Sequence, residues 1–246
     1  MKYDIDHCTR LLKERKLILI CDLDETLISS IYLNDNYLDP NFDKSIVVTL
    51  SEEQKKNNHI YIKLRPHLSD FLEKISNIFE LHLMSMGNEA HVKKCVEIID
   101  PYRQYFGDRI TSRENIVNSD DKAKTTEEMF QEYSNIIISL DDNIDVWNNS
   151  ATLISIEPLN YFSSLEKMLK CLSLTNKKHM QIYIEDYLGN LEMCLKDNSL
   201  LFLQSVLKEF HEEFFKVLDK GNSDKTKMLL PDIGHIMDKK RNRSKI

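Results

Sequence analysis

The chain has 246 residues, of which 41% are hydrophobic and 30% charged, and its formal net charge is −7. These proportions are typical of a soluble globular protein with one sizeable α/β core. An acidic chain is a poor general ligand for nucleic acid, and only five glycines leave no Gly-rich nucleotide loop. The polar N-terminus and the absence of a long apolar run predict neither a targeting peptide nor a membrane span.

The cysteine usage predicts a reduced, intracellular protein. There are five cysteines, widely spaced and without a C-x-x-C pair, so neither a disulfide framework nor a structural zinc site is expected. The chain also has eight scattered histidines, and none of them is assigned to catalysis.

Short apolar runs in the first two thirds of the chain predict strands that are buried on both faces. They cover residues 17–21 (LILIC), 80–84 (ELHLM), 136–140 (IIISL) and 152–156 (TLISI). Helical spacing lies between them, at Leu68, Phe71, Leu72, Ile75 and Phe79, and again at Ala90, Val92, Val96 and Ile99. Strands that alternate with helices indicate an open, mostly parallel α/β sheet.

Two stretches depart from this alternation. Residues 28–60 are too long for a tight connection and predict a flap, with β segments at 46–50 and 60–64. Residues 161–218 are predicted to be largely helical and carry an apolar stripe of core residues, namely Leu200, Leu203, Leu207, Phe210, Phe214 and Val217.

Polar side chains follow directly after three of the apolar strands, at Asp22, Ser85 and Asp141. Ligands bind at the carboxyl ends of the strands in such sheets, so these residues are expected to meet in one crevice. Asp22 and Asp24 supply two carboxylates in a D-x-D-x-T segment. One can attack phosphorus and the other can handle the leaving group's proton. The oxygen-rich set suits Mg²⁺, with the backbone carbonyl of Asp24 as a further ligand.

The segment LILICDLDETLI resembles the first motif of the haloacid-dehalogenase superfamily, and more narrowly that of the FCP/SCP phosphatases that act on the RNA polymerase II C-terminal domain. IYIKLRPHLSDFL, the region HLMSMGNEAHVKKCVEIIDP and SLDDNIDVW resemble further motifs of that family in the same order. The resemblance covers roughly residues 16–160 and thins beyond them.

The resemblance implies a role for each matching residue. Asp22 would be the nucleophile and Asp24 the general acid/base, with Mg²⁺ held by Asp22, Asp24 and Asp142 together with Asp141. The phosphate-binding set would be Thr26, Ser85, Lys124 and Arg65. Ser85 stands where the family has Thr. Lys122 competes with Lys124, which is otherwise a surface lysine, and Arg65 is alternatively a structural ion-pair partner. Trp147 is interpreted as packing.

The implied fold is a three-layer haloacid-dehalogenase core with a flap after the first strand. Residues 1–246 would form one phosphatase domain, with core segments at about 14–160 and 197–218, a helical insertion at about 161–196, a basic tail at 219–246 and no BRCT domain. The tail cations, Lys239, Lys240, Arg241, Arg243 and Lys245, indicate either a solvated end or a nuclear-import signal.

The implied function is a nuclear protein serine/threonine phosphatase for the RNA polymerase II C-terminal repeat. General transcription factors would be further partners, with no direct contact to nucleic acid or membrane. Two alternatives stay open: a phosphatase for small metabolites, and a non-catalytic scaffold of the same fold.

Overall fold

The computed structural model describes residues 3–34, 46–50, 58–148, 150–162 and 188–221. Its centre is a five-stranded parallel sheet in the order β6 (Ile110–Thr111), β5 (Phe79–Met84), β1 (Leu17–Cys21), β7 (Ile137–Asp141) and β8 (Leu153–Ser155). Every residue of β1 is buried, as its unbroken apolar run predicts for a central strand covered on both faces. The parallel α/β class predicted from the sequence is confirmed.

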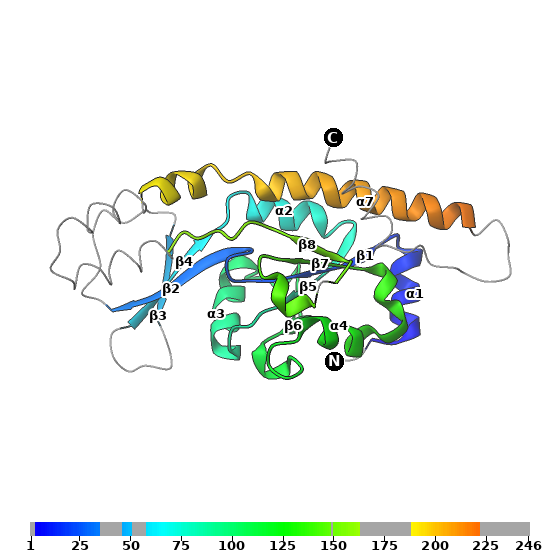
Figure 1. Cartoon of the computed structure of the whole chain (residues 1–246), viewed down its shortest axis with the longest axis horizontal. Coiled ribbons are helices and arrows are strands. Elements are labelled where there is room, and N and C mark those ends of the chain that lie inside the picture. Colours follow the sequence, from blue (N-terminus) through cyan, green and yellow to red (C-terminus); the bar gives the residue numbers. More distant parts are fainter. Residues whose placement is uncertain (1–2, 35–45, 51–57, 149, 163–187, 222–246) are drawn as a thin grey trace.

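Helices cover both faces of this sheet (Figure 1). Helices α2 (Leu68–Ile75) and α7 (Ser199–Gly221) pack together on one face, and α3 (Glu89–Ile99) and α4 (Lys122–Phe130) lie on the other. Short 3₁₀ turns, Arg113–Asn115, Gln131–Ile136 and Ile144–Trp147, complete the connections. The three-layer core expected from the sequence is therefore present.

Two features of the helices differ from the prediction. Helix α1 (Ile5–Lys13) precedes the sheet and was not predicted, although Asp4 accepts a hydrogen bond from the backbone N–H of His7 as its N-cap. In α7 the buried stripe ends with Phe215 and Leu218, whereas Val217 is 39% exposed. The assignment of Val217 to the core was wrong because the stripe drifts around a long straight helix.

The flap is a three-stranded antiparallel sheet in the order β2 (Ile28–Asn34), β4 (Asn58–Leu64) and β3 (Ile46–Leu50). It continues directly from the segment after β1 and lies beside the main sheet (Figure 1). The predicted β segments at 46–50 and 60–64 are confirmed, and β2 is a further strand. The flap therefore borders the carboxyl end of β1.

The described part of the second half is smaller than the predicted helical region. Residues 188–195 are helical and lead into α7. Tyr61, Leu159, Tyr161, Phe162 and Cys194 form a second apolar cluster, which ties the flap to this region. Residues 163–187 and 222–246 lie outside the described ranges, and so do most of the predicted insertion and the basic tail. Within the described ranges, no helix is both long and apolar enough to cross a bilayer.

Candidate active site

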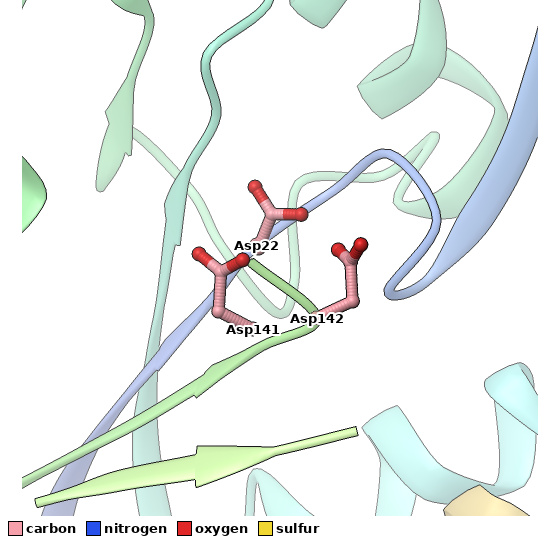
Figure 2. Close-up of side chains that lie close together, drawn as sticks. All are labelled: Asp22, Asp141 and Asp142. Carbon is pink, nitrogen blue, oxygen red and sulfur yellow. The ribbon is translucent and has the colours of Figure 1, made fainter. Parts of the chain in front are cut away.

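The sheet brings three carboxylates to one edge. Strand β1 pairs with β7 so that Cys21 lies opposite Leu140, and the backbone N–H of Asp22 donates to Leu140 O at 2.9 Å. Asp22 and the Asp141–Asp142 pair therefore follow neighbouring strand ends. Each of the three offers an oxygen within 4.8 Å of the others, and their carboxylates point to the same side of the sheet (Figure 2). The structure therefore brings Asp22 and Asp141 together at the strand ends, as the sequence predicts.

Lys122 is the lysine inside this cluster. Its Nζ lies 2.6 Å from Asp22 Oδ1 and 2.6 Å from Asp141 Oδ2, and the residue is 1% exposed. Lys124 does not reach the carboxylates. It sits two positions further along α4, roughly 200° around the helix axis, where it lines a surface hollow with Trp147 and Asn148.

The placement of Lys124 in the site, favoured from the sequence, is therefore corrected to Lys122. Lys122 faces the carboxylates because of the position at which α4 begins. Asp121 is the N-cap and accepts a hydrogen bond from the backbone N–H of Lys124, so the helix begins at Lys122 and turns that side chain toward the sheet.

Asp141 and Asp142 have different surroundings. Asp141 Oδ2 accepts from Lys122 Nζ and from the indole N–H of Trp147 at 2.7 Å, while Oδ1 accepts the Asn143 N–H at 2.8 Å. Trp147 is thus more than packing. Asp142 is only partly buried, and one of its oxygens accepts from Thr26 Oγ1 at 3.0 Å. Asp142 therefore keeps an oxygen for a ligand, whereas both oxygens of Asp141 are engaged by the protein.

Thr26 and Glu25 hold the turn that carries the two motif aspartates. Thr26 is fully buried behind Asp142, to which it is joined by two hydrogen bonds through Oγ1. Glu25 has a left-handed backbone with φ of 59°. Its carboxylate accepts from Ser29 Oγ and from the Asn160 N–H, so the strained conformation is held on both sides. The structure places Thr26 as a support of Asp142, and its predicted contact with phosphate stays a prediction.

Asp24 lies at the open side of the site. Its Oδ1 accepts from Ser30 Oγ at 2.9 Å, and His91 Nε2 lies 2.9 Å from Oδ1 and 3.0 Å from Oδ2. No histidine is assigned to catalysis from the sequence, and the structure places His91 in contact with Asp24. Its sequence distance from Asp24 concealed the contact. The available signal was its position in the first turn of a helix that follows the carboxyl end of a strand.

Ser85 and Arg65 occupy different positions. Ser85 directly follows β5 and is 1% exposed. Its hydroxyl accepts the Gly87 N–H at 2.9 Å, which leaves its own proton available for donation. Arg65 is 2% exposed. Its Nε lies 3.1 Å from Asp197 Oδ2, and its Nη2 donates to Glu157 O at 2.5 Å. These contacts fit the structural ion-pair alternative for Arg65, which joins the flap to the segment before α7.

Burial and the neighbouring charges shift the pKa values of the groups in this cluster. Burial raises the pKa of Asp22, against the opposing attraction of Lys122. Burial alone would lower the pKa of Lys122, but the Asp22 and Asp141 charges outweigh it and raise the pKa. Burial also raises the pKa of Asp142. Lys122 is therefore held as a buried ammonium among acidic groups.

The family model of the NLI interacting factor-like phosphatases matches residues 17–181, a span that contains all of these site residues. The chain belongs to this family. Two curated relatives are named as phosphatases of the RNA polymerase II C-terminal domain. The protein from Caenorhabditis elegans is 28% identical over 239 residues, which are 95% of this chain and 33% of that protein. The protein from Schizosaccharomyces pombe is 32% identical over 171 residues, or 65% and 23% of the two chains.

The solved structures show the same fold. The structure of Fcp1, described as an essential RNA polymerase II CTD phosphatase, superimposes with a TM-score of 0.78 at 25% identity, and covers 97% of this chain and 74% of that chain. A fission yeast Fcp1 variant bound to beryllium fluoride superimposes with a TM-score of 0.75, also at 25% identity, and covers 95% and 73%. The haloacid-dehalogenase-like α/β fold is thus confirmed. The chain spans about a third of the length of the Caenorhabditis elegans relative.

Proposed function

We propose that this protein is a magnesium-dependent phosphoprotein phosphatase with Asp22 as covalent nucleophile and Asp24 as general acid/base. The contact between Lys122 and Asp22 carries the proposal. The ammonium engages Asp22 Oδ1 at 2.6 Å, so Oδ2 is the oxygen left to attack. The same cation is placed to bind the oxygens of a phosphoryl group that arrives at Asp22, as an anionic group in transfer requires.

The first step transfers the phosphoryl group to the protein. Asp22 Oδ2 forms a bond to phosphorus as the bond between phosphorus and the seryl oxygen breaks. Asp24 gives its proton to that oxygen, which leaves as a neutral hydroxyl. Asp24 suits this role because its side chain is 34% exposed at the open side of the site, whereas that of Asp22 is 8% exposed.

The second step releases phosphate. Asp24, now a carboxylate, takes a proton from a water molecule whose oxygen attacks phosphorus. The bond between phosphorus and Asp22 Oδ2 breaks, and inorganic phosphate and the Asp22 carboxylate result. Ser85 stands at the neighbouring strand end with a hydroxyl proton to donate, and Lys122 offers positive charge to the phosphoryl oxygens through both steps.

The acidic cluster fits a divalent cation. Asp22, Asp141 and Asp142 set three carboxylates against the one ammonium of Lys122, and their oxygens lie within 4.8 Å of one another. Hard oxygen donors of this kind suit Mg²⁺. Because Asp141 is already engaged by three donors, Asp22, Asp142 and the Asp24 carbonyl would hold the ion directly. When bound, Mg²⁺ supplies Lewis-acid stabilisation of the charge on the transferring group.

The proposed substrate is phosphoserine in the C-terminal repeat of the largest RNA polymerase II subunit, and the proposed location is the nucleus. Support comes from the relatives, several of which are named for that substrate. The solved relative that binds beryllium fluoride adds to it, because that compound stands in for a phosphoryl group.

Two carboxylate variants test the mechanism. Asp22→Asn should neither hydrolyse p-nitrophenyl phosphate nor form a phosphoenzyme. Asp24→Asn should release a burst of nitrophenol, about one equivalent per enzyme, and then turn over very slowly, because nitrophenolate leaves without a proton whereas water still needs a base. Early quenching and mass spectrometry should locate phosphate on the peptide that carries Asp22. A wild-type protein with no Mg²⁺-dependent hydrolysis would favour the scaffold alternative.

A further inference from the structure

His91 is in direct contact with the carboxylate to which we assign proton transfer. Its Nε2 lies 2.9 Å from Asp24 Oδ1 and 3.0 Å from Oδ2, and its Nδ1 lies 3.0 Å from the hydroxyl of Tyr32 on the flap. In the step where Asp24 is a carboxylate it accepts hydrogen bonds and donates none, so Nε2 then carries the shared proton. In the neutral ring, Nδ1 then accepts from Tyr32. The three side chains form one chain of hydrogen bonds from the flap to the site.

The fold holds the imidazole in one orientation. Asn88 caps α3 and accepts the His91 backbone N–H at 2.8 Å, while Cys95 Sγ lies 3.7 Å from Nε2 one helical turn further on. His91 is 8% exposed. Space for the ring depends on Gly87, because a Cβ there would lie 2.7 Å from His91 Cδ2. The ring is therefore enclosed on several sides before it meets Asp24.

The contact restricts a side chain that would otherwise rotate. Asp24 is at the open side of the site, and a partly exposed carboxylate has a broad range of χ2. Ser30 Oγ and His91 Nε2 both approach Oδ1 at 2.9 Å, and His91 alone reaches Oδ2, at 3.0 Å. Among the described residues, Oδ2 thus has fewer protein donors than Oδ1, and it is the oxygen better placed to carry the transferred proton.

We propose that His91 is the positioning residue that orients the Asp24 carboxylate for proton transfer, with Tyr32 as its outer support. The inference rests on the proposed function, in which Asp24 is the acid and base. It assigns His91 no contact with the substrate. Its consequence is that loss of His91 should reduce the rate most where the leaving group needs a proton.

The test compares leaving groups in His91→Phe and His91→Gln. Phenyl phosphate releases a much less acidic phenol than p-nitrophenyl phosphate, so it needs the acid more. The phosphoenzyme formation rate of His91→Phe should fall on the order of 10-fold or more with phenyl phosphate, within the range of acid/base catalysis, and clearly less with p-nitrophenyl phosphate. His91→Gln places an amide N–H near the Nε2 position and should recover much of the loss. Tyr32→Phe should show a smaller loss with the same dependence on leaving group.

A double-mutant cycle separates positioning from a structural role. If His91 acts through Asp24, His91→Phe should reduce the rate of phosphoenzyme formation from phenyl phosphate in the wild-type background and leave it within about two-fold in the Asp24→Asn background. Equal losses in both backgrounds, or equal losses for both substrates, would overturn the inference while the proposed function stands. A wild-type enzyme that forms no phosphoenzyme would overturn both. Thermal unfolding of each variant establishes that the compared proteins are folded.

Discussion

At the scale of single residues, the site depends on a lysine whose ammonium is shared by two buried carboxylates. Lys122 contacts Asp22 and Asp141 at 2.6 Å each. Removing the ammonium leaves both carboxylates without their counter-charge in a buried setting, which is costly. The residue therefore balances the charge of the resting site, and the proposed function gives it a second role in phosphoryl transfer.

The two lysines of α4 provide a matched pair of variants. Lys122→Ala should reduce kcat/KM on the order of 10²-fold or more, because a charge aimed at the transferring group is lost. Lys124→Ala should stay close to wild type, since that side chain lines a surface hollow away from the carboxylates. Steady-state hydrolysis of p-nitrophenyl phosphate measures both. The opposite ranking would show that the placement of Lys122 has no bearing on the reaction.

The site residues that follow strands could be predicted from the sequence, and those on other elements could not. Asp22, Ser85 and Asp141 each follow an apolar run, so the topology of a parallel sheet is enough to bring them together. To choose Lys122, the start of α4 had to be known within one residue, because an error of two residues places the chosen side chain on the opposite face of the helix. His91 required the depth at which α3 packs against the segment after β1, which spacing alone does not encode.

At the scale of elements, α1 is fixed to the sheet through Glu80 on β5. His7 Nε2 and His82 Nε2 lie 2.8 Å and 2.9 Å from Glu80 Oε1, and Arg10 Nη2 lies 3.7 Å from Oε2. Burial alone would raise the pKa of Glu80, but the contacts with His82 and His7 outweigh it and lower the pKa to about 2. The folded state thus favours the ionised carboxylate.

A pH dependence of stability follows from this depressed pKa. Glu80 stabilises the fold fully above its unfolded pKa of 4.5, and the contribution is lost as pH falls toward about 2. Burial lowers the pKa of His82, so the fold also loses stability as pH falls below the unfolded pKa of 6.5, where the unfolded chain binds a proton that the buried ring does not. Glu80→Gln should lower the free energy of unfolding at pH 7 on the order of 2 kcal/mol, and the difference should shrink at pH 4 and below.

Urea unfolding at several pH values measures the effect, with Glu73→Gln as control. Glu73 is an exposed glutamate on α2, so its substitution should change little at any pH. A Glu80 variant whose deficit is constant from pH 7 to pH 3 would show that packing, and not the charge, connects α1 to the sheet.

The central strands of the fold could be predicted from the sequence more readily than the short edge strand β6 and the N-terminal helix α1. Four of the five strands of the main sheet follow from apolar runs of 5 residues, since central parallel strands are apolar on both faces. Strand β6, with only Ile110 and Thr111, is too short to leave a pattern. Helix α1 did offer a signal, because Cys8, Leu11 and Leu12 recur at helical spacing after the Asp4 cap, but its attachment through Glu80 is a tertiary contact. Length and local composition therefore set the limit of what could be expected.

At the scale of the whole molecule, the acidic cluster that would hold Mg²⁺ also affects the stability of the fold. Asp22, Asp141 and Asp142 place like charges close together, with Lys122 as the opposing cation within the cluster. Like charges in one site destabilise each other, and a bound divalent cation relieves that repulsion. A cation that binds the folded protein and not the unfolded chain raises the free energy of unfolding.

Mg²⁺ should therefore raise the thermal unfolding midpoint, even in the absence of substrate. At a concentration 100 times the dissociation constant the gain is about 2.7 kcal/mol, which corresponds to a shift on the order of 5 °C in a chain of this size.

Asp142→Asn keeps an oxygen for Thr26 but removes a charge from the cluster. In EDTA its midpoint should equal or exceed that of wild type, because repulsion has been reduced, and Mg²⁺ should raise it much less. Asp120→Asn changes an exposed carboxylate outside the cluster and should respond to Mg²⁺ as wild type does. Differential scanning fluorimetry across a Mg²⁺ titration distinguishes these cases. Equal Mg²⁺ responses of wild type and Asp142→Asn would place the ion elsewhere.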